Sequence, residues 1–171
     1  LVVSRMILKM MDKVSKPALA GFWPNKNGVN IVLDLGANIE CDSRNLVDFA
    51  ELGSALHKSL FPNDISKVSL LNIGLEEIKG TDILKETYKK LKNLSGENNF
   101  IFKGYSEGNT IMSGESNVIV TDGFTGNIAL KTAEGTAKFI TDNLKLALTE
   151  NFISKISLLF SYFSLKKFKN K

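Results

Sequence analysis

The sequence predicts an α/β domain with a mostly parallel sheet, and three observations lead to this fold class. Short, continuous apolar runs such as Ile31–Leu33 and Val118–Val120 are typical of strands that are buried on both faces. Stretches with apolar residues near a 3.6-residue period alternate with these runs and indicate helices. The runs also end in turns that are rich in Gly, Asn and Asp. Such alternation implies right-handed βαβ units, and hence parallel strands.

The first half of the chain is predicted to hold a helix, two strands and a second helix. Residues 1–13 place apolar side chains on one helical face, and Lys16-Pro17 ends that helix because proline cannot continue it. The apolar stretch Ala18–Phe22 is a short buried strand, and Asn25–Asn30 is a turn before the strand at Ile31–Leu33. Apolar residues at helical spacing then predict a helix over Asn45–Leu60, which a Pro-Asn-Asp sequence stops.

The second half repeats the alternation of strand and helix. Val68–Ile73 is the next strand, and a threonine cap precedes a helix over Asp82–Leu94. Asn99–Lys103 is a short strand. The strand Val118–Thr121 leads through a polar turn into a helix whose apolar residues recur as far as Leu148.

Size and composition describe a soluble globular protein. The chain has 171 residues, 43% of them hydrophobic, which is enough for one domain with a real core. Its single cysteine, Cys41, cannot form an internal disulfide, so a reducing compartment and a structural role are expected. The only histidine, His57, lies within a predicted helix and is expected on its surface or in a satisfied core position. With one His and one Cys, no metal-ligand cluster is expected.

The positive charge of the chain is concentrated at its C-terminal end. The formal net charge is +4, but residues 151–171 contain five lysines and no acid, which leaves the other 150 residues at −1. A basic groove for nucleic acid across the body is therefore not expected. The chain accordingly divides into a partial α/β domain over residues 1–150 and a basic, amphipathic helical tail over residues 151–171.

Three strands are followed by turns of similar polar chemistry: Asp34–Asn38, Asn72–Gly74 and Asp122–Asn127. A parallel sheet brings such turns together at its carboxyl edge, where ligands bind. The last turn opens a helix, whose free N–H groups and positive dipole end favour an anion. Gly123 and Gly126 are expected to let the backbone approach a ligand. The alternative is that this turn is only a connection with a capping residue.

The loop after the second turn contributes the only cation of the three turns, Lys79, beside Glu76 and Glu77, which are expected on a solvated face. A solvated loop lysine is the alternative for Lys79. Neither the G-x-G-x-x-G dinucleotide fingerprint nor the G-x-x-x-x-G-K-[ST] phosphate loop is present in the sequence. The local chemistry therefore indicates an anion site without identifying the anion.

These motifs resemble the bacterial phosphate acyltransferase of phospholipid synthesis. The resemblance covers nearly the whole chain, and its most specific part is T-D-G-F-T-G-N-x-x-L-K-T-x-E-G. It is also carried by Val32–Asn38, Gly53-Ser54, Leu70–Gly74, Glu77–Gly80, Phe100–Gly104 and Val118–Gly135. It implies a three-layer α/β/α Rossmann-like fold of the isocitrate dehydrogenase-like group. The glycine-rich turns that open this family's chains and its C-terminal part have no counterpart here, so the fold is expected to be incomplete at both ends.

The resemblance implies transfer of a fatty acyl group from acyl-acyl carrier protein to inorganic phosphate, without a cofactor or metal. It assigns catalysis to Lys79 of the E-x-K-G loop and Asn127 of the T-G-N turn. Residues expected to bind phosphate or substrate and to shape the pocket are Asp34, Asn38, Asn72, Asp122, Gly123, Thr125 and Gly126. The alternatives are a non-catalytic truncated remnant and, less favoured, a nicotinamide dehydrogenase of the same broad fold. The isolated chain is expected to be inactive and prone to expose apolar surface.

The family resemblance further implies a cytoplasmic homodimer in the complete enzyme that associates peripherally with the membrane. The tail fits this, because its apolar part, Phe152–Leu165, is too short to span a bilayer and the lysines after it suit anionic headgroups. The side chains expected to contact the membrane share one helical face: Phe152, Ile156, Phe160 and Phe163. The alternative is a core helix with a solvated end.

Overall fold

The computed structural model describes residues 14–96 and 100–150. Within them a five-stranded sheet has the order β1-β2-β5-β3-β4, and all neighbours are parallel except β1 and β2. The strands are β1 (Gly21–Asn25), β2 (Gly28–Leu33), β3 (Ser66–Leu71), β4 (Phe100–Ser106) and β5 (Val118–Val120). The predicted mostly parallel α/β fold is confirmed. The helix expected over residues 1–13 lies outside the described residues.

The first strand and the turn after it differ from the sequence prediction. β1 begins three residues later than expected, and Asn25–Asn30 is not a single turn, because β2 already begins at Gly28. The two strands form an antiparallel hairpin in which Asn25 pairs with Gly28 across a two-residue turn. Pro24 stands within β1, which is tolerated because β1 is an edge strand and needs fewer donors.

The limits of β3 and β4 also differ from the predicted limits by two or three residues. β3 begins and ends two residues earlier than predicted, and Ile73, which is expected within it, is exposed. β4 extends to Ser106, three residues past its predicted end, and stays paired with β3 through an irregular register.

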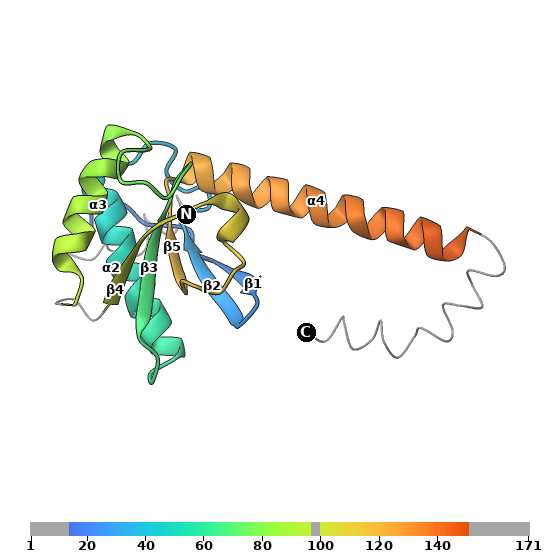
Figure 1. The fold of residues 1–171 in the computed structure, drawn as a ribbon, viewed down its shortest axis with the longest axis horizontal. Helices are drawn as coiled ribbons and strands as arrows, with labels where there is room; N and C mark the ends of the chain where they lie inside the picture. The colour runs from blue at the N-terminus through green and yellow to red at the C-terminus, as the bar shows by residue number, and fades with distance from the viewer. Residues whose placement is uncertain (1–13, 97–99, 151–171) are drawn as a thin grey trace, which may run out of the picture. The chain divides into compact units, whose positions relative to one another are not determined.

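The helices α2 (Ser43–Leu60) and α3 (Asp82–Leu94) lie on one face of the sheet (Figure 1). α2 packs against β2, β5 and β3, and α3 packs against α2 and β4. Gly53 lets α2 come close, since a Cβ there would lie 2.6 Å from Val118 Cγ1 and 2.7 Å from Leu33 Cδ1. Phe49 of α2 is fully buried in the core that this contact closes. Both helices agree closely with the predicted limits.

The helix α4 (Gly123–Thr149) follows β5, as the sequence predicts, but it begins earlier than expected, because Gly123–Asn127 form its first turn and not a polar turn before it. Backbone contacts divide the chain into two units, residues 1–130 and residues 131–171, with the division inside this helix. The predicted boundary at residue 150 stays a prediction, because the tail over 151–171 lies outside the described residues. All strands, and the cavity described next, belong to the first unit.

Candidate functional site

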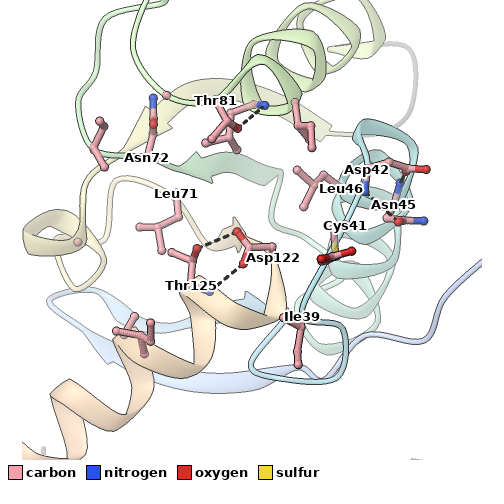
Figure 2. A pocket seen from close by; sticks show the side chains of 18 of the residues that line it. Ile39, Cys41, Asp42, Asn45, Leu46, Leu71, Asn72, Thr81, Asp122 and Thr125 are labelled. Carbon is pink, nitrogen blue, oxygen red and sulfur yellow. Dashed lines mark hydrogen bonds between the residues drawn. The ribbon is translucent and has the colours of Figure 1, made fainter.

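A cavity of about 930 Å³ opens at the carboxyl ends of the parallel strands. Its lining includes Ile39 to Asp42 after β2, Asn72 and Gly80 after β3, and Asp122 and Thr125 after β5 (Figure 2). Two of the three predicted turns, those at Asn72 and Asp122, therefore contribute to the lining, whereas the Asp34–Asn38 turn does not and the residues directly after it do. Its apolar side chains are Ile39, Leu46, Leu71, Ile73, Ile83, Leu84, Ile128 and Ala129.

Three helices point their N-terminal ends at this cavity, and each is capped by its own residue. Asp42 accepts a hydrogen bond from Asn45 N (2.8 Å) at α2, within a capping box. Thr81 accepts from Leu84 N (3.3 Å) at α3, which confirms the predicted cap. Of the three caps, only Thr81 is uncharged. The N-terminus of α3 thus has an uncharged cap, although its first turn carries the carboxylate of Asp82, which forms an ion pair with Lys85.

Asp122 caps α4 and binds the same residue twice. Its Oδ1 accepts from Thr125 N and its Oδ2 accepts from Thr125 Oγ1, both at 2.8 Å. The capping alternative considered for this turn is therefore correct for Asp122. Its carboxylate occupies the position that an anion would take at this helix end.

The turn after β2 is organised by the buried side chain of Asp34. The exposed fraction of Asp34 is 0%, and its oxygens accept from Gly36 N (3.2 Å), Ala37 N (2.9 Å) and Asn38 N (2.8 Å). Leu19 N donates to the same carboxylate, as does the Asn38 side chain. Because these contacts saturate the carboxylate, Asp34 shapes the turn and does not line the cavity.

The glycines of the last turn allow contact between two protein segments. The N–H of Gly123 donates to the Asn38 carbonyl (2.8 Å), and a Cβ on Gly123 would overlap the Asn38 backbone. A Cβ on Gly126 would overlap the carbonyl oxygen of Asp34. The close approach expected between this turn and a ligand is instead an approach to the Asp34–Asn38 turn. The Thr125 and Gly126 N–H groups are also engaged, both with Asp122.

Lys79 lies beside the cavity rather than in its lining. Its Nζ forms an ion pair with Glu76 Oε1 (3.2 Å), and its side chain lies over Gly74. A hydrogen bond from its own backbone N–H, followed by the bond from Lys79, lowers the pKa of Glu76. Glu76 is exposed, as expected, but it has a definite partner.

Glu77 is exposed, as expected, and its carboxylate has two partners on α3. Its Oε1 accepts from Tyr88 OH (2.9 Å) and from Lys92 Nζ (3.1 Å). The hydrogen bonds from Lys92, first, and from Tyr88 lower the pKa of Glu77. Glu77 thereby joins the loop to α3.

Asn127 packs against Gly36, with its Cγ 3.4 Å from the position of a Cβ on that glycine. Like Lys79, it lies next to lining residues without being one of them. Of the predicted site residues, the structure brings Asn72, Asp122 and Thr125 into the cavity lining. It places Asp34, Asn38, Gly123 and Gly126 in the supporting contacts behind it.

Sequence reasoning missed the part of the wall that α2 contributes. The spacing Asp42-x-x-Asn45 is a capping signal that could have located this helix end. Cys41 also lines the cavity; burial raises the pKa of its thiol. His57 is in a satisfied core position, as expected, with Nδ1 3.0 Å from Ser66 Oγ. Burial lowers the pKa of its imidazole.

Residues 14–96 and 100–150 contain no cluster of three or more His, Cys, Asp or Glu side chains placed to hold a metal ion. Within the same ranges, no helix has both the length and the apolar character needed to cross a membrane.

The fold is that of the phosphotransacetylases. The EutD phosphotransacetylase from Staphylococcus aureus superposes with a TM-score of 0.62 over 79% of this chain and 46% of its own, at 21% identity. A phosphotransacetylase from Streptococcus pyogenes gives 0.59 over 77% and 45%, at 16% identity. These likenesses define the class of fold.

The chain belongs to the family described as fatty acid synthesis protein, whose model matches residues 1–171. It is 59% identical over 171 residues to the phosphate acyltransferase of Pelagibacter ubique, covering 100% of this chain and 51% of that protein. It is 41% identical over 155 residues to that of Maricaulis maris, covering 91% and 44%. The resemblance read from the motifs is confirmed, and the chain spans about half the length of these curated relatives.

Proposed function

We propose that this chain supplies part of the active site of a phosphate acyltransferase, which moves a fatty acyl group from acyl-acyl carrier protein to inorganic phosphate. The observation that carries the proposal is the identity of 59% to a relative of that name, maintained along the whole chain. Cytoplasmic placement, a homodimer and peripheral binding to an anionic membrane belong to the same proposal.

The cavity supports the acyl half of this proposal. Its aliphatic side chains come from α2, α3, α4 and the ends of β2 and β3, so an alkyl chain would meet apolar atoms on several sides. Asn72 follows the end of β3 and Thr81 caps α3, and the lining also holds the charged residues Lys16, Glu40, Asp42 and Asp122. Such a lining suits a ligand with a long apolar body and one polar end.

The phosphate half is supported by the N-terminus of α3. This helix end has the uncharged cap, faces the cavity, and follows Lys79 and Gly80 directly. A phosphate bound there would interact favourably with the positive end of the helix dipole. It would also pair with the Lys79 ammonium, which would leave its ion pair with Glu76 to bind the substrate. Asn127 would orient the phosphate or the thioester carbonyl from the opposite turn.

The reaction needs positioning and charge stabilisation rather than a cofactor. A phosphate oxygen attacks the thioester carbonyl carbon, a C–O bond forms, and negative charge collects on the carbonyl oxygen. The C–S bond then breaks, and the carrier thiolate leaves and takes a proton. Holding phosphate beside the thioester makes the step effectively intramolecular. Donors such as Lys79 and Asn127 would stabilise the oxyanion.

A chimera tests the proposal in a protein of full family length. This chain would replace the matching half of the Pelagibacter ubique phosphate acyltransferase, and acyl phosphate formation would be measured. Lys79→Ala and Asn127→Ala are each expected to lower kcat/KM at least tenfold, about 1.4 kcal/mol of transition-state stabilisation. Lys85→Ala is the matched control, because Lys85 also pairs with an acid three residues away.

The two other functions considered predict different results. A folded chimera without turnover would support a non-catalytic remnant, and a nicotinamide-dependent absorbance change would support a dehydrogenase. Full activity in Lys79→Ala would show that the catalytic assignment is wrong even if the reaction is right.

A further inference from the structure

The loop Gly74–Gly80 that carries Lys79 is held on its inner side by one buried side chain. Asn72 is 8% exposed, and its Nδ2 donates to the carbonyl oxygens of Gly74 (3.1 Å) and Lys79 (3.2 Å). These two bonds close the loop at its ends. They leave its middle, from Leu75 to Ile78, without an inner hydrogen-bond anchor from Asn72.

The outer side of the loop is held by Glu77. Its Oε1 receives the hydroxyl of Tyr88 and the ammonium of Lys92, both on α3. Tyr88 is itself fixed, since its ring lies 5.1 Å from that of Phe102 and 4.8 Å from that of Tyr105, centroid to centroid. Glu77 is thus joined through Tyr88 to an aromatic cluster between α3 and β4, and it also pairs with the exposed Lys92.

The rest of the loop offers little packing. Leu75 and Ile78 are 59% and 81% exposed, so neither side chain anchors the segment. Lys79 N bonds to the Glu76 carbonyl (3.0 Å), which makes a tight turn around Glu77. A shift of Glu77 therefore moves the backbone of Lys79 with it.

We propose that Glu77 is a positioning residue, which sets the place of Lys79 at the cavity by fastening this loop to Tyr88 and Lys92. The proposal rests on the proposed function only for what Lys79 does. Glu77 stands two positions before Lys79 and fastens the loop to α3, so it limits the positions that the Lys79 ammonium can reach. Small displacements of this kind change rates strongly in reactions that depend on positioning.

The first test measures the loop itself in the 171-residue chain by hydrogen–deuterium exchange. Glu77→Ala is expected to speed amide exchange in residues 74–80 about tenfold, because loops with few buried contacts open locally at low cost. Glu77→Gln keeps an acceptor oxygen for the Tyr88 hydroxyl and is expected to restore most of the protection. Glu86→Ala is the matched control: Glu86 pairs with Lys90 on α3 at 2.7 Å and is 59% exposed, against 60% for Glu77.

The second test uses the chimera described above. Glu77→Ala is expected to lower kcat and raise KM for phosphate, together about tenfold in kcat/KM, with KM for the acyl donor unchanged. The effects of Glu77→Ala and Tyr88→Phe on kcat/KM are expected to be non-additive, since both substitutions remove the same hydrogen bond, from the Tyr88 hydroxyl to Glu77 Oε1.

The outcomes separate the two proposals. Unchanged loop exchange in Glu77→Ala, or equal loosening in Glu86→Ala, overturns the positioning role. A chimera without acyl phosphate formation overturns the proposed function, while the exchange data still decide the role of Glu77. Equal rises of KM for both substrates in Glu77→Ala would indicate general loosening of the site, and this result also overturns the positioning role of Glu77.

Discussion

At the scale of single residues, Gly126 shows how the site is built. It sits in the first turn of α4, where a side chain would meet the Asp34 carbonyl oxygen and Thr121 Cγ2. The contact joins the turns after β2 and β5, so it sets the spacing of two walls of the candidate site. Its role is close packing between two backbones, for which only glycine is small enough.

Gly126→Ala is therefore expected to destabilise the fold by about 2 kcal/mol, because the backbone at Asp34 cannot move away cheaply. Chemical denaturation of the 171-residue chain measures this. Gly135→Ala is the control within the same helix: nothing lies within 4 Å of a Cβ there, so alanine should raise stability by up to about 1 kcal/mol. Equal effects of both substitutions would contradict the packing role.

At the scale of elements, the start of α4 depends on Asp122. Its two bonds to Thr125 satisfy one backbone donor and one side-chain hydroxyl at the helix end. The carboxylate also interacts favourably with the helix dipole. The first turn of α4 and the cavity wall that it forms are thus stabilised together.

Asp122→Ala is expected to cost about 1 kcal/mol of stability, the usual value for a lost N-cap. Asp122→Asn keeps an acceptor for Thr125 N and should lose only a fraction of that. Thermal unfolding of the two variants beside the parent chain checks the order. The capping role is wrong if asparagine and alanine destabilise equally.

The elements also show what could be predicted from the sequence. The apolar run at Ile31–Leu33 and the helical spacing after Asp122 depend only on local periodicity, and both predictions are correct. The first strand is predicted three residues too early, because Pro24 suggests a break in the sequence and only the sheet order shows that this strand lies at an edge. Glu77 is exposed, as expected, but its two partners on α3 could not be predicted, because they lie 11 and 15 residues away in sequence.

The candidate site was partly predictable for the same reason. Strand ends meet at one edge of any parallel sheet, so the meeting of the turns at Asn72 and Asp122 followed from topology. That Gly123 faces the Asn38 carbonyl instead of a ligand did not follow, because it depends on the distance between two turns. The catalytic roles of Lys79 and Asn127 stay predictions.

At the scale of the whole molecule, the tail over residues 151–171 carries the membrane part of the proposal. Binding to anionic vesicles is expected to be reversible and sensitive to salt, with lysines adding about 1 kcal/mol each near the surface. Replacing Phe160 and Phe163 by serine should weaken binding more than replacing any single lysine, since more apolar area is lost. Flotation with anionic liposomes measures this, and equal binding by the parent and the double serine variant would contradict it.

The position of β5 in the sheet has a consequence for how the protein is made. Among the residues that the structure describes, β5 comes last of the five strands in sequence, yet it pairs with β2 on one side and β3 on the other. While the ribosome is still adding residues before Val118, the β1–β2 hairpin and the β3–β4 pair have no strand between them. Joining them requires contacts between residues far apart in sequence, which slows folding. The cavity at the carboxyl ends of these strands therefore cannot be completed until β5 has emerged and inserted.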